Sequence, residues 1–304
     1  MSKFLITIIG PTAIGKTALS IKLAKAFGCE IISCDSRQFY KEMTIGTAVP
    51  DAHELAAAPH HFIHNKSISD FYSVGDFEKE AIGTLDVLFQ KCDVAILVGG
   101  SGLYVDAVLN GFDEFPSIDA SVRERITAQF NEYGLEYLQA EVSKRDPEYF
   151  AQVDIHNPQR LMRALEVCIG TGHPYSLFRK KNKKERNFIP IVVGLDAPRE
   201  LLYERIAQRV DAMVANGLFE EALELYPYRH LNALQTVGYR EIFDYFDGKS
   251  DRESAVSEIK KNTRRFAKRQ LTWFRRNEHA TWFPIGDDDA ILSFVRNSLV
   301  TGNH

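Results

Sequence analysis

The hydrophobic residues of this chain fall into short runs that alternate with longer amphipathic segments. The runs predict strands at residues 4–9, 30–34, 94–98, 189–195 and 281–285. The second to fourth are nearly continuous in Ile, Val and Leu, as is typical of parallel strands buried on both faces. Helical periodicity predicts helices between them, at residues 16–27, 76–90 and 198–216. This alternation predicts an α/β fold with a doubly wound parallel sheet.

The alternation stops between about residues 112 and 186, where the sequence has no strand candidate. Helix-like periods occupy residues 121–133, 135–144 and 158–169, and the stretch ends in a basic run at 179–186, RKKNKKER. We therefore expect an α/β core made of residues 1–112 and 187–304, with residues 113–186 inserted as an all-helical subdomain. After residue 196 the pattern is helical nearly to the end, including a long amphipathic helix predicted over 250–276.

A glycine-rich motif follows the first predicted strand. Residues 10–17 read GPTAIGKT, which fits GxxxxGK[ST] between a strand and a helix. Gly10 and Gly15 let the backbone turn so that N–H groups point at phosphate oxygens, and the next helix directs its positive dipole end at the anion. Lys16 supplies a charge and Thr17 a hydroxyl for magnesium. The motif predicts an NTPase-like phosphate loop formed by Gly10, Pro11, Thr12, Ala13, Ile14, Gly15, Lys16 and Thr17.

The usual apparatus of a nucleotide hydrolase does not accompany this loop. The best candidate for a magnesium-binding strand, residues 94–98, runs into GGSGLY rather than into an Asp, and no guanine-reading NKxD follows. The second strand does end in a carboxylate, Asp35. Ligands of open parallel sheets bind beyond the carboxyl ends of the strands, so Asp35 is predicted to face the phosphate loop. A turn-capping role for Asp35 is the alternative.

The predicted long helix is strongly basic toward its end. Residues 259–277 contain no acidic residue and interleave aromatic side chains with eight basic ones, namely Lys260, Lys261, Arg264, Arg265, Lys268, Arg269, Arg275 and Arg276. A solvated helix face usually mixes charges, so this pattern favours contact with phosphates. The three histidines of HHFIH, at 60, 61 and 64, lie in an expected loop without a Cys or a carboxylate at ligand spacing, which disfavours a metal site.

Composition narrows the class of protein but does not indicate an activity. The net charge is −4, and 45% hydrophobic and 26% charged residues are ordinary values for a soluble globular protein. No signal peptide and no run of membrane-spanning length is evident. The four cysteines lack C-x-x-C spacing, which indicates reduced thiols without a metal. We therefore expect a cytoplasmic protein without a membrane partner. A monomer is the expected oligomeric state, although composition does not determine it.

Taken in order, these motifs resemble those of the tRNA dimethylallyltransferases, also called tRNA isopentenyltransferases. The resemblance spans nearly the whole chain. It is carried by GPTAIGKT (10–17), DSRQFYKEMTIGTA (35–48), HH (60–61), VGGSGLY (98–104), DPEYFAQVDIHNPQRLMRALE (146–166), RVDAMVANGL (209–218), QTVGYRE (235–241) and TRRFAKRQLTWFR (263–275). Eight such segments in order are far more specific than any one of them.

The resemblance implies whose phosphates the loop binds. The donor would be dimethylallyl diphosphate, bound with magnesium. The acceptor would be the exocyclic amine of the adenine immediately 3′ of the anticodon, in tRNAs that read codons beginning with U. Displacement at the allylic carbon would release pyrophosphate, which requires no hydrolase carboxylate. The target base would have to leave its stack, and the helical insertion resembles the module that closes over the anticodon stem-loop.

The resemblance also implies roles for particular residues. Asp35 would position the amine or accept its proton, Thr12 and Arg209 would act beside the diphosphate, and Thr17 would bind magnesium. Arg205 precedes Arg209 by one helical turn and is expected on the same face. The positions that match the family's tRNA contacts are Asp35, Ser36, Arg37, Gln38, Ser101, Arg123, Gln159, Arg160, Leu161, Met162, Arg163, Gln235, Gly238, Tyr239 and Arg240.

Two other functions compete with this interpretation. A small-molecule or nucleoside-phosphate kinase could use the same loop, with Asp35 activating a hydroxyl group. Such an enzyme needs arginines that close on ATP, and the sequence does not mark them. The other rival is a non-catalytic RNA-binding switch that senses a nucleotide through the loop.

Overall fold

The computed structural model describes residues 2–179 and 184–302. These divide into two compact units, one joining Met1–Leu109 to Glu185–His304 and the other spanning Asn110–Lys184. Residues 180–183 of the basic run lie outside the described residues.

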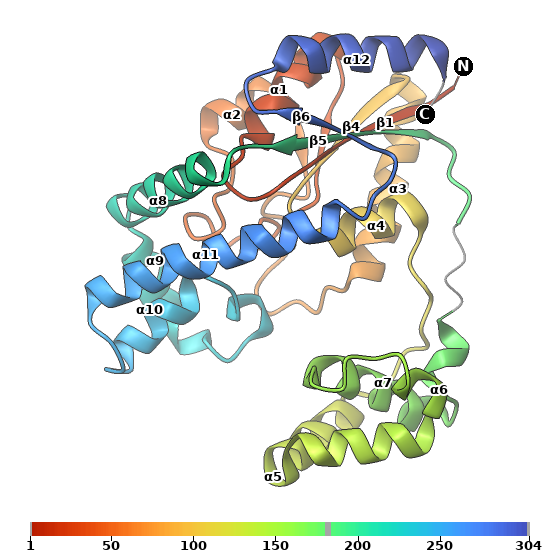
Figure 1. The fold of residues 1–304 in the computed structure, drawn as a ribbon, viewed down its shortest axis with the longest axis vertical. Helices are drawn as coiled ribbons and strands as arrows, with labels where there is room; N and C mark the ends of the chain where they lie inside the picture. Colours follow the sequence, from red (N-terminus) through yellow and green to blue (C-terminus); the bar gives the residue numbers. More distant parts are fainter. Residues whose placement is uncertain (1, 180–183, 303–304) are drawn as a thin grey trace. The chain divides into compact units, whose positions relative to one another are not determined.

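The larger unit is built on a parallel sheet (Figure 1). Its strands lie in the order β3-β2-β4-β1-β5-β6, and every neighbouring pair is parallel. In chain order they are β1 Phe4–Ile9, β2 Ile31–Ser33, β3 His60–His61, β4 Val94–Val98, β5 Ile189–Asp196 and β6 Ala280–Pro284. Strands β2, β3 and β4 lie on one side of β1, and the later strands β5 and β6 lie on its other side. The predicted doubly wound parallel fold is confirmed.

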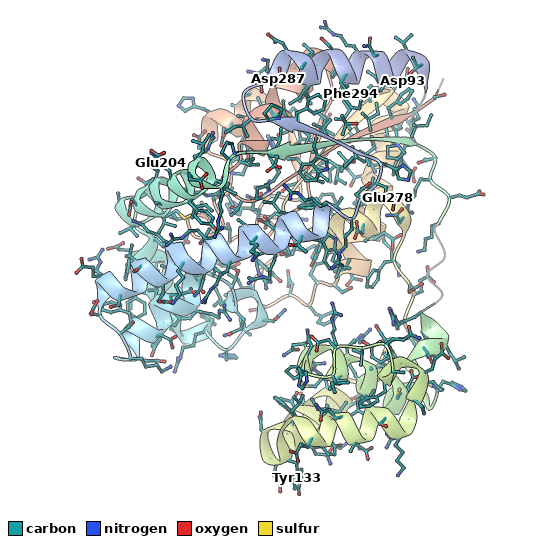
Figure 2. All side chains as sticks on the ribbon, viewed as in Figure 1. Asp93, Tyr133, Glu204, Glu278, Asp287 and Phe294 are labelled. Carbon is teal, nitrogen blue, oxygen red and sulfur yellow. The ribbon has the colours of Figure 1, made fainter. Side chains whose placement is uncertain are left out.

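Helices cover both faces of this sheet. Those of the larger unit are α1 Lys16–Phe27, α2 Ala52–Ala57, α3 Val74–Lys91, α4 Gly102–Asn110, α8 Arg199–Ala215, α9 Leu218–Leu225, α10 Tyr239–Phe246, α11 Arg252–Phe274 and α12 Asp288–Thr301, with 3-10 turns at η2 Tyr226–Tyr228 and η3 Asn232–Leu234. Because side chains alternate along a strand, Ile6 and Ile8 of β1 pack with α1, α8 and α12, whereas Leu5 and Ile9 pack with α3 and α4. Phe294 of α12 contacts Phe283 of β6, with ring centres 5.4 Å apart (Figure 2).

Strand β3 differs from the sequence-based prediction. His60 and His61 were expected in a loop, but they pair with Ile31 and Ile32 of β2. The prediction of a loop is wrong at these two residues. A strand of two residues is too short to show an alternating pattern, so only its pairing with β2 reveals it.

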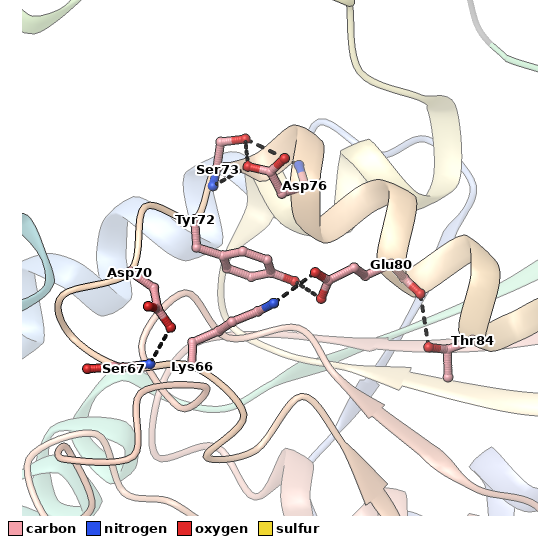
Figure 3. Close-up of polar contacts among 8 residues, drawn as sticks. All are labelled: Lys66, Ser67, Asp70, Tyr72, Ser73, Asp76, Glu80 and Thr84. Atoms are coloured by element: carbon pink, nitrogen blue, oxygen red, sulfur yellow. Dashed lines mark hydrogen bonds and ion pairs between the residues drawn. The ribbon is translucent and has the colours of Figure 1, made fainter. Parts of the chain in front are cut away.

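Side-chain contacts hold the segment between β3 and α3 (Figure 3). Lys66 Nζ lies 2.8 Å from one carboxylate oxygen of Glu80 and 4.4 Å from the centre of the Tyr72 ring. The Tyr72 hydroxyl donates to the other oxygen of Glu80 at 2.8 Å. Ser73 and Asp76 form a capping box at the start of α3. The box satisfies backbone N–H groups of the first turn, which explains why α3 begins at Val74 rather than at the predicted residue 76.

Helices α8 to α11 enclose a separate hydrophobic core in the same unit. It includes Val210, Leu218, Tyr239, Ile242 and Ile259. The longest element here is α11, which realises the long amphipathic helix predicted over 250–276. Among residues 2–179 and 184–302, none of the helices combines the length and the apolar character needed to cross a membrane.

Among its described residues, the regular elements of the smaller unit are all helices. It contains α5 Ala120–Arg145, α6 Pro147–Phe150, α7 Pro158–Thr171 and the 3-10 turn η1 Tyr175–Phe178. Gly134 interrupts α5 with φ 72° and ψ −163°, at the boundary between the two helices that the sequence predicts. Tyr133, just before this break, is 60% exposed (Figure 2), whereas Ile126 and Leu138 lie in the core of the unit.

Candidate active site

A cavity of about 840 Å³ opens at the carboxyl ends of the strands. Its lining comes from the phosphate loop after β1, from residues around the end of β2, from residues 98–101 at the end of β4, and from α8 and α11. This is the edge at which open parallel sheets bind their ligands. The cavity therefore combines the segments that the sequence singled out, which are far apart along the chain.

The phosphate loop has the backbone conformation that its glycines were predicted to allow. Gly10 has φ 148°, and a Cβ atom there would lie 2.9 Å from the carbonyl oxygen of Leu195. Gly15 has φ 104° and immediately precedes α1. A residue with a side chain is strained at both positions.

Lys16 lies inside this loop. Its ammonium group donates to the carbonyl oxygens of Gly10 at 3.0 Å and Pro11 at 2.7 Å. Burial and the positive charge of Arg209 lower the pKa of Lys16 to about 7, while the negative charge of Asp35 opposes the shift. An anion bound in the loop would favour the charged form of Lys16.

Two arginines of α8 reach the same loop. The Arg209 guanidinium donates to the hydroxyl of Thr12 at 3.3 Å, and Arg205 donates to the carbonyl oxygen of Ala13 at 3.0 Å. Burial lowers the pKa of Arg209, and the charge of Asp35 partly offsets this effect. Helix α8 thus brings two cations to the loop, and Arg205 lies one turn before Arg209 on the same face, as the spacing predicts.

Asp35 lines the cavity together with the phosphate loop, as predicted. One of its oxygens also accepts the backbone N–H of Arg37 at 2.9 Å, so the alternative role in a turn is present as well. The N–H of Ser36 donates to the hydroxyl of Ser101 at 2.9 Å, which joins the end of β2 to the end of β4. The turn fixes one carboxylate oxygen and leaves the other for a ligand.

The side-chain amide of Gln38 is held on both sides. Its oxygen accepts from the Ser33 hydroxyl at 3.0 Å, and its nitrogen donates to the carbonyl oxygens of Thr47 at 3.2 Å and Ala48 at 2.9 Å. Gln38 lines the cavity, as its predicted contact with the target base requires. The contact itself stays a prediction.

A residue that sequence analysis missed, Glu221 of α9, anchors one wall of the cavity. Its carboxylate accepts the backbone N–H groups of Thr44, Ile45 and Gly46 at 2.8–2.9 Å and the hydroxyl of Tyr239 at 2.6 Å. This segment leads to cavity-lining residues that include Ala48, whose φ of 49° is strained for a residue with a side chain. No local motif marks Glu221, because its backbone partners lie about 175 residues earlier in the chain.

Replacing Glu221 with Ala is expected to lower the free energy of unfolding. The change leaves three backbone donors and the Tyr239 hydroxyl without their acceptor, which costs roughly 1–3 kcal/mol. Urea denaturation followed by circular dichroism measures the effect. The control is Glu224→Ala on the same helix, where the side chain is exposed. Equal effects of the two substitutions would contradict the anchoring role.

Three of the predicted tRNA contacts have buried side chains. Leu161 and Met162 lie in the core of the smaller unit. Tyr239 is fully buried, and its hydroxyl donates a hydrogen bond to Glu221. Their side chains are not accessible to RNA in this structure, and a tRNA contact at these three positions stays a prediction. In both segments that match the family's tRNA contacts, buried residues stand next to exposed ones such as Arg160 and Arg240. The sequence alone does not tell the two kinds apart.

Three predicted contacts of the smaller unit, Arg123, Gln159 and Arg163, belong to one polar network with Glu166. Arg123 donates to the side-chain oxygen of Gln159 at 2.9 Å and lies 3.3 Å from Glu166. Arg163 pairs with the same glutamate at 2.9 Å. Glu166 was not predicted as a site residue, yet it fixes two of the arginines.

The tRNA contacts predicted at residues 235–240 belong to the larger unit. Gln235 donates to the carbonyl oxygen of Arg229 at 2.7 Å, and Gly238 lines the cavity.

The basic helix α11 is less uniformly basic in the structure than in its sequence. Lys260 pairs with Asp211 of α8 at 2.6 Å, Arg275 pairs with Asp196 of β5 at 2.7 Å, and Lys261 pairs with Glu258 of its own helix at 2.8 Å. These three basic side chains are therefore ion-paired within the protein, and the predicted contact of the stretch with phosphates stays a prediction. Arg265, Lys268 and Arg269 remain exposed. The acidic partners of Lys260 and Arg275 come from other elements, so the sequence of the helix could not reveal them.

Metal-ligating clusters are not found in the part of the chain that the structure describes, since no group of three or more His, Cys, Asp or Glu side chains is placed to hold an ion. His61 instead contacts Glu30 at 2.7 Å. The cavity does contain the hydroxyl of Thr17 and the carboxylate of Asp35. Oxygen donors of this kind suit Mg²⁺, which usually keeps several waters and takes further ligands from substrate phosphates.

Comparison with known proteins tests the resemblance. A family model described as IPP transferase matches residues 38–277. The tRNA dimethylallyltransferase of Flavobacterium johnsoniae is 58% identical over 304 residues, which cover 98% of each chain. This chain belongs to the tRNA dimethylallyltransferase family. The family predicted from the motifs is confirmed, and the enzyme class is that of a prenyltransferase.

Solved structures of similar proteins agree with this assignment. The full-length tRNA isopentenylpyrophosphate transferase of Bacillus halodurans is 38% identical and superposes with a TM-score of 0.71, covering all of both chains. A eukaryotic dimethylallyltransferase acting on tRNA superposes with a TM-score of 0.81 over 81% of its own length. At 24% identity that second likeness shows the tRNA dimethylallyltransferase fold alone.

Proposed function

We propose that this protein transfers the dimethylallyl group of dimethylallyl diphosphate to an adenine of tRNA. The acceptor is the N6 amine of the adenine immediately 3′ of the anticodon, in tRNAs that read codons beginning with U, and the products are the modified tRNA and pyrophosphate. The proposed place of action is the cytoplasm, and the proposed active form is a monomer.

One observation carries this proposal beyond the family assignment. The cavity is lined by a phosphate loop, by two partly buried cations, Lys16 and Arg209, and by the carboxylate of Asp35, whose charge acts on both of them. Cations suit the diphosphate group, whereas a carboxylate suits the amine that attacks the prenyl carbon. The cavity thus offers both halves of an alkyl transfer in one place.

The chain's own residues can act on each part of this reaction. As the N6–carbon bond forms, the bond from the allylic carbon to the diphosphate oxygen breaks, and negative charge grows on the leaving group. Lys16, Arg209 and the N-terminus of α1 stabilise that charge, and the Arg209 bond to Thr12 keeps the arginine against the loop. Asp35 orients the amine and accepts the proton that the nitrogen must lose.

Magnesium is the proposed cofactor. Thr17 would bind it through its hydroxyl, and the ion would neutralise charge on the diphosphate when bound.

Contact with the tRNA anticodon stem-loop is proposed for both units. The exposed arginines of the smaller unit and the exposed basic side chains of α11 suit a phosphate backbone. The helical insertion, residues 113–186 as predicted and Asn110–Lys184 in the structure, is the proposed module for the anticodon stem-loop.

A transfer assay separates this function from its rivals. The protein is incubated with unmodified tRNA, magnesium and labelled dimethylallyl diphosphate, with and without ATP. Label transferred to tRNA without ATP supports the proposal. Phosphorylation that requires ATP would instead identify a kinase, and absence of any covalent product would favour an RNA-binding switch.

The exposed basic side chains of α11 give a second test. Replacing Lys268 and Arg269 with Gln is expected to weaken tRNA binding and to flatten its salt dependence. The logarithmic slope should change by about 0.7–0.9 for each phosphate that the variant no longer neutralises. Filter binding at several salt concentrations measures this effect.

A matched pair of exposed lysines controls for the loss of charge. Lys25 and Lys91 lie in the last turns of α1 and α3, and their replacement by Gln should leave the slope unchanged. If the two double variants have the same slope, the basic face of α11 is only solvated.

A further inference from the structure

A buried glutamine of α11 joins the phosphate loop to the end of β4. Gln270 is 6% exposed. Its side-chain oxygen accepts the backbone N–H of Thr12 at 2.8 Å, and its nitrogen donates to the carbonyl oxygen of Gly100 at 2.8 Å. The three residues come from segments separated by at least 88 positions in the sequence, so the contact is entirely a product of the fold.

The two hydrogen bonds fix the orientation of the amide. Thr12 offers a donor and Gly100 offers an acceptor, so a flipped amide would set two donors against each other and two oxygens against each other. Neither a carboxylate nor an apolar side chain can satisfy both groups. The position therefore requires a neutral side chain that donates on one side and accepts on the other.

Gln270 belongs to a stripe of α11 that faces the cavity. Ile259, Thr263, Phe266 and Gln270 all line it, and their spacing of four, three and four residues places them on one side of a helix. Space at the nitrogen of the Gln270 amide is limited, because a Cβ atom at Gly100 would lie 2.4 Å from it. Gly100, the second glycine of GGSGLY, thus leaves room for this amide.

Thr12 connects this contact to the cations of the site. Its N–H is bound by Gln270 and its hydroxyl accepts from Arg209, so both groups are held in place. A shift of Thr12 would change the position of the loop and the contact with the arginine together.

We propose that Gln270 is a positioning residue for the diphosphate group, one that holds the phosphate loop and the end of β4 in the arrangement that binds it. The role rests on the proposed function, since the diphosphate is that of the prenyl donor. It concerns the donor, because the two hydrogen bonds of Gln270 reach the phosphate loop and the end of β4.

The first test removes both hydrogen bonds while keeping the bulk of the side chain. Gln270→Leu is expected to weaken binding of inorganic pyrophosphate with magnesium by about 10- to 100-fold, as measured by calorimetric titration, because two backbone groups lose their partner. In transfer assays the KM for dimethylallyl diphosphate should rise, with the affinity for tRNA unchanged. The control is Gln139→Leu, where a glutamine of α5 donates to the carbonyl oxygen of Ile155 at 3.0 Å.

The second test distinguishes positioning from packing. A protonated glutamate at position 270 accepts from Thr12 and donates to Gly100 as the amide does, whereas the ionised form sets two oxygens together. Burial raises the pKa of such a carboxyl group, so the pyrophosphate affinity of Gln270→Glu, taken relative to wild type, should recover as the pH falls from about 8 to about 5.5. A residue that only fills space would show no such recovery.

A third variant breaks the same contact from the other side. Gly100→Ala should displace the amide, and its loss of pyrophosphate affinity should not add to that of Gln270→Leu. Wild-type pyrophosphate affinity in Gln270→Leu, or no pH-dependent recovery in Gln270→Glu, would overturn the proposal. If the variants lose pyrophosphate binding as expected but the wild type transfers no prenyl group to tRNA, the positioning role stands and the proposed function fails.

Discussion

Asp35→Asn is expected to slow prenyl transfer by about 10²–10⁴-fold, the usual contribution of a positioned general base. An exocyclic adenine amine is a poor nucleophile because its lone pair is delocalised into the ring. It becomes cationic as it attacks and must lose a proton. Asn keeps an oxygen that can accept the N–H of Arg37, so the turn at the end of β2 should persist while the charge and the basicity are lost. Single-turnover transfer measures the chemical step directly.

The affinities decide what kind of role Asp35 has. Binding of tRNA and of the diphosphate should stay within a few-fold of wild type, since the substitution removes an interaction made mainly in the transition state. The control is Asp119→Asn, because an oxygen of Asp119 accepts the N–H of the residue two positions later, Ser121, at 2.9 Å, as in the Asp35 turn. A near-normal rate for Asp35→Asn would reduce Asp35 to a turn-forming residue. Lost binding with an unchanged chemical step would make it a substrate anchor.

Lys16→Ala is expected to remove most of the affinity for the prenyl diphosphate. Lys16 lies inside the loop, where a charged hydrogen bond to phosphate oxygens is worth about 1.5–3 kcal/mol, or roughly 10- to 150-fold in affinity. Binding of tRNA should be nearly intact, because the anion of the loop belongs to the small substrate. Separate titrations with tRNA and with dimethylallyl diphosphate measure the two effects. Lys25→Ala, on the exposed face of the same helix, is the control and should change neither affinity.

The dependence on pH gives Lys16 a signature of its own. Its pKa in the free protein is about 7, so the side chain loses its charge as the pH rises through neutrality. Above this pH Lys16 is neutral, and it must take up a proton when the diphosphate binds, because the anion favours the charged form. Binding of the diphosphate is therefore weaker at higher pH. Wild-type affinity should therefore fall between about pH 6.5 and pH 8.5 more steeply than that of Lys16→Ala. Parallel curves, or equal losses of tRNA and diphosphate binding in the variant, would contradict the assigned role.

Much of the fold could be predicted because its signals are local. The strands of the sheet core are continuous apolar runs, since both faces of β1 and its neighbours are covered by helices. Gly10 and Gly15 mark a loop whose backbone demands glycine, and Gly134 marks a break in α5. Strand β3 escaped prediction because a strand of two residues has no pattern to read.

The candidate site could be predicted only as far as its motifs reach. The sequence by itself determined the family, the phosphate loop and the placement of Asp35 at the end of β2, because glycine conformations, apolar runs and strand ends are encoded within a few residues. Only the tertiary structure decided that Glu221 holds the segment before Ala48, that Gln270 joins Thr12 to Gly100, and that Tyr239 is buried rather than exposed. These contacts join residues far apart along the chain. Which backbone donors and acceptors remain for a distant side chain depends on how the helices pack, and no stretch of sequence contains both partners.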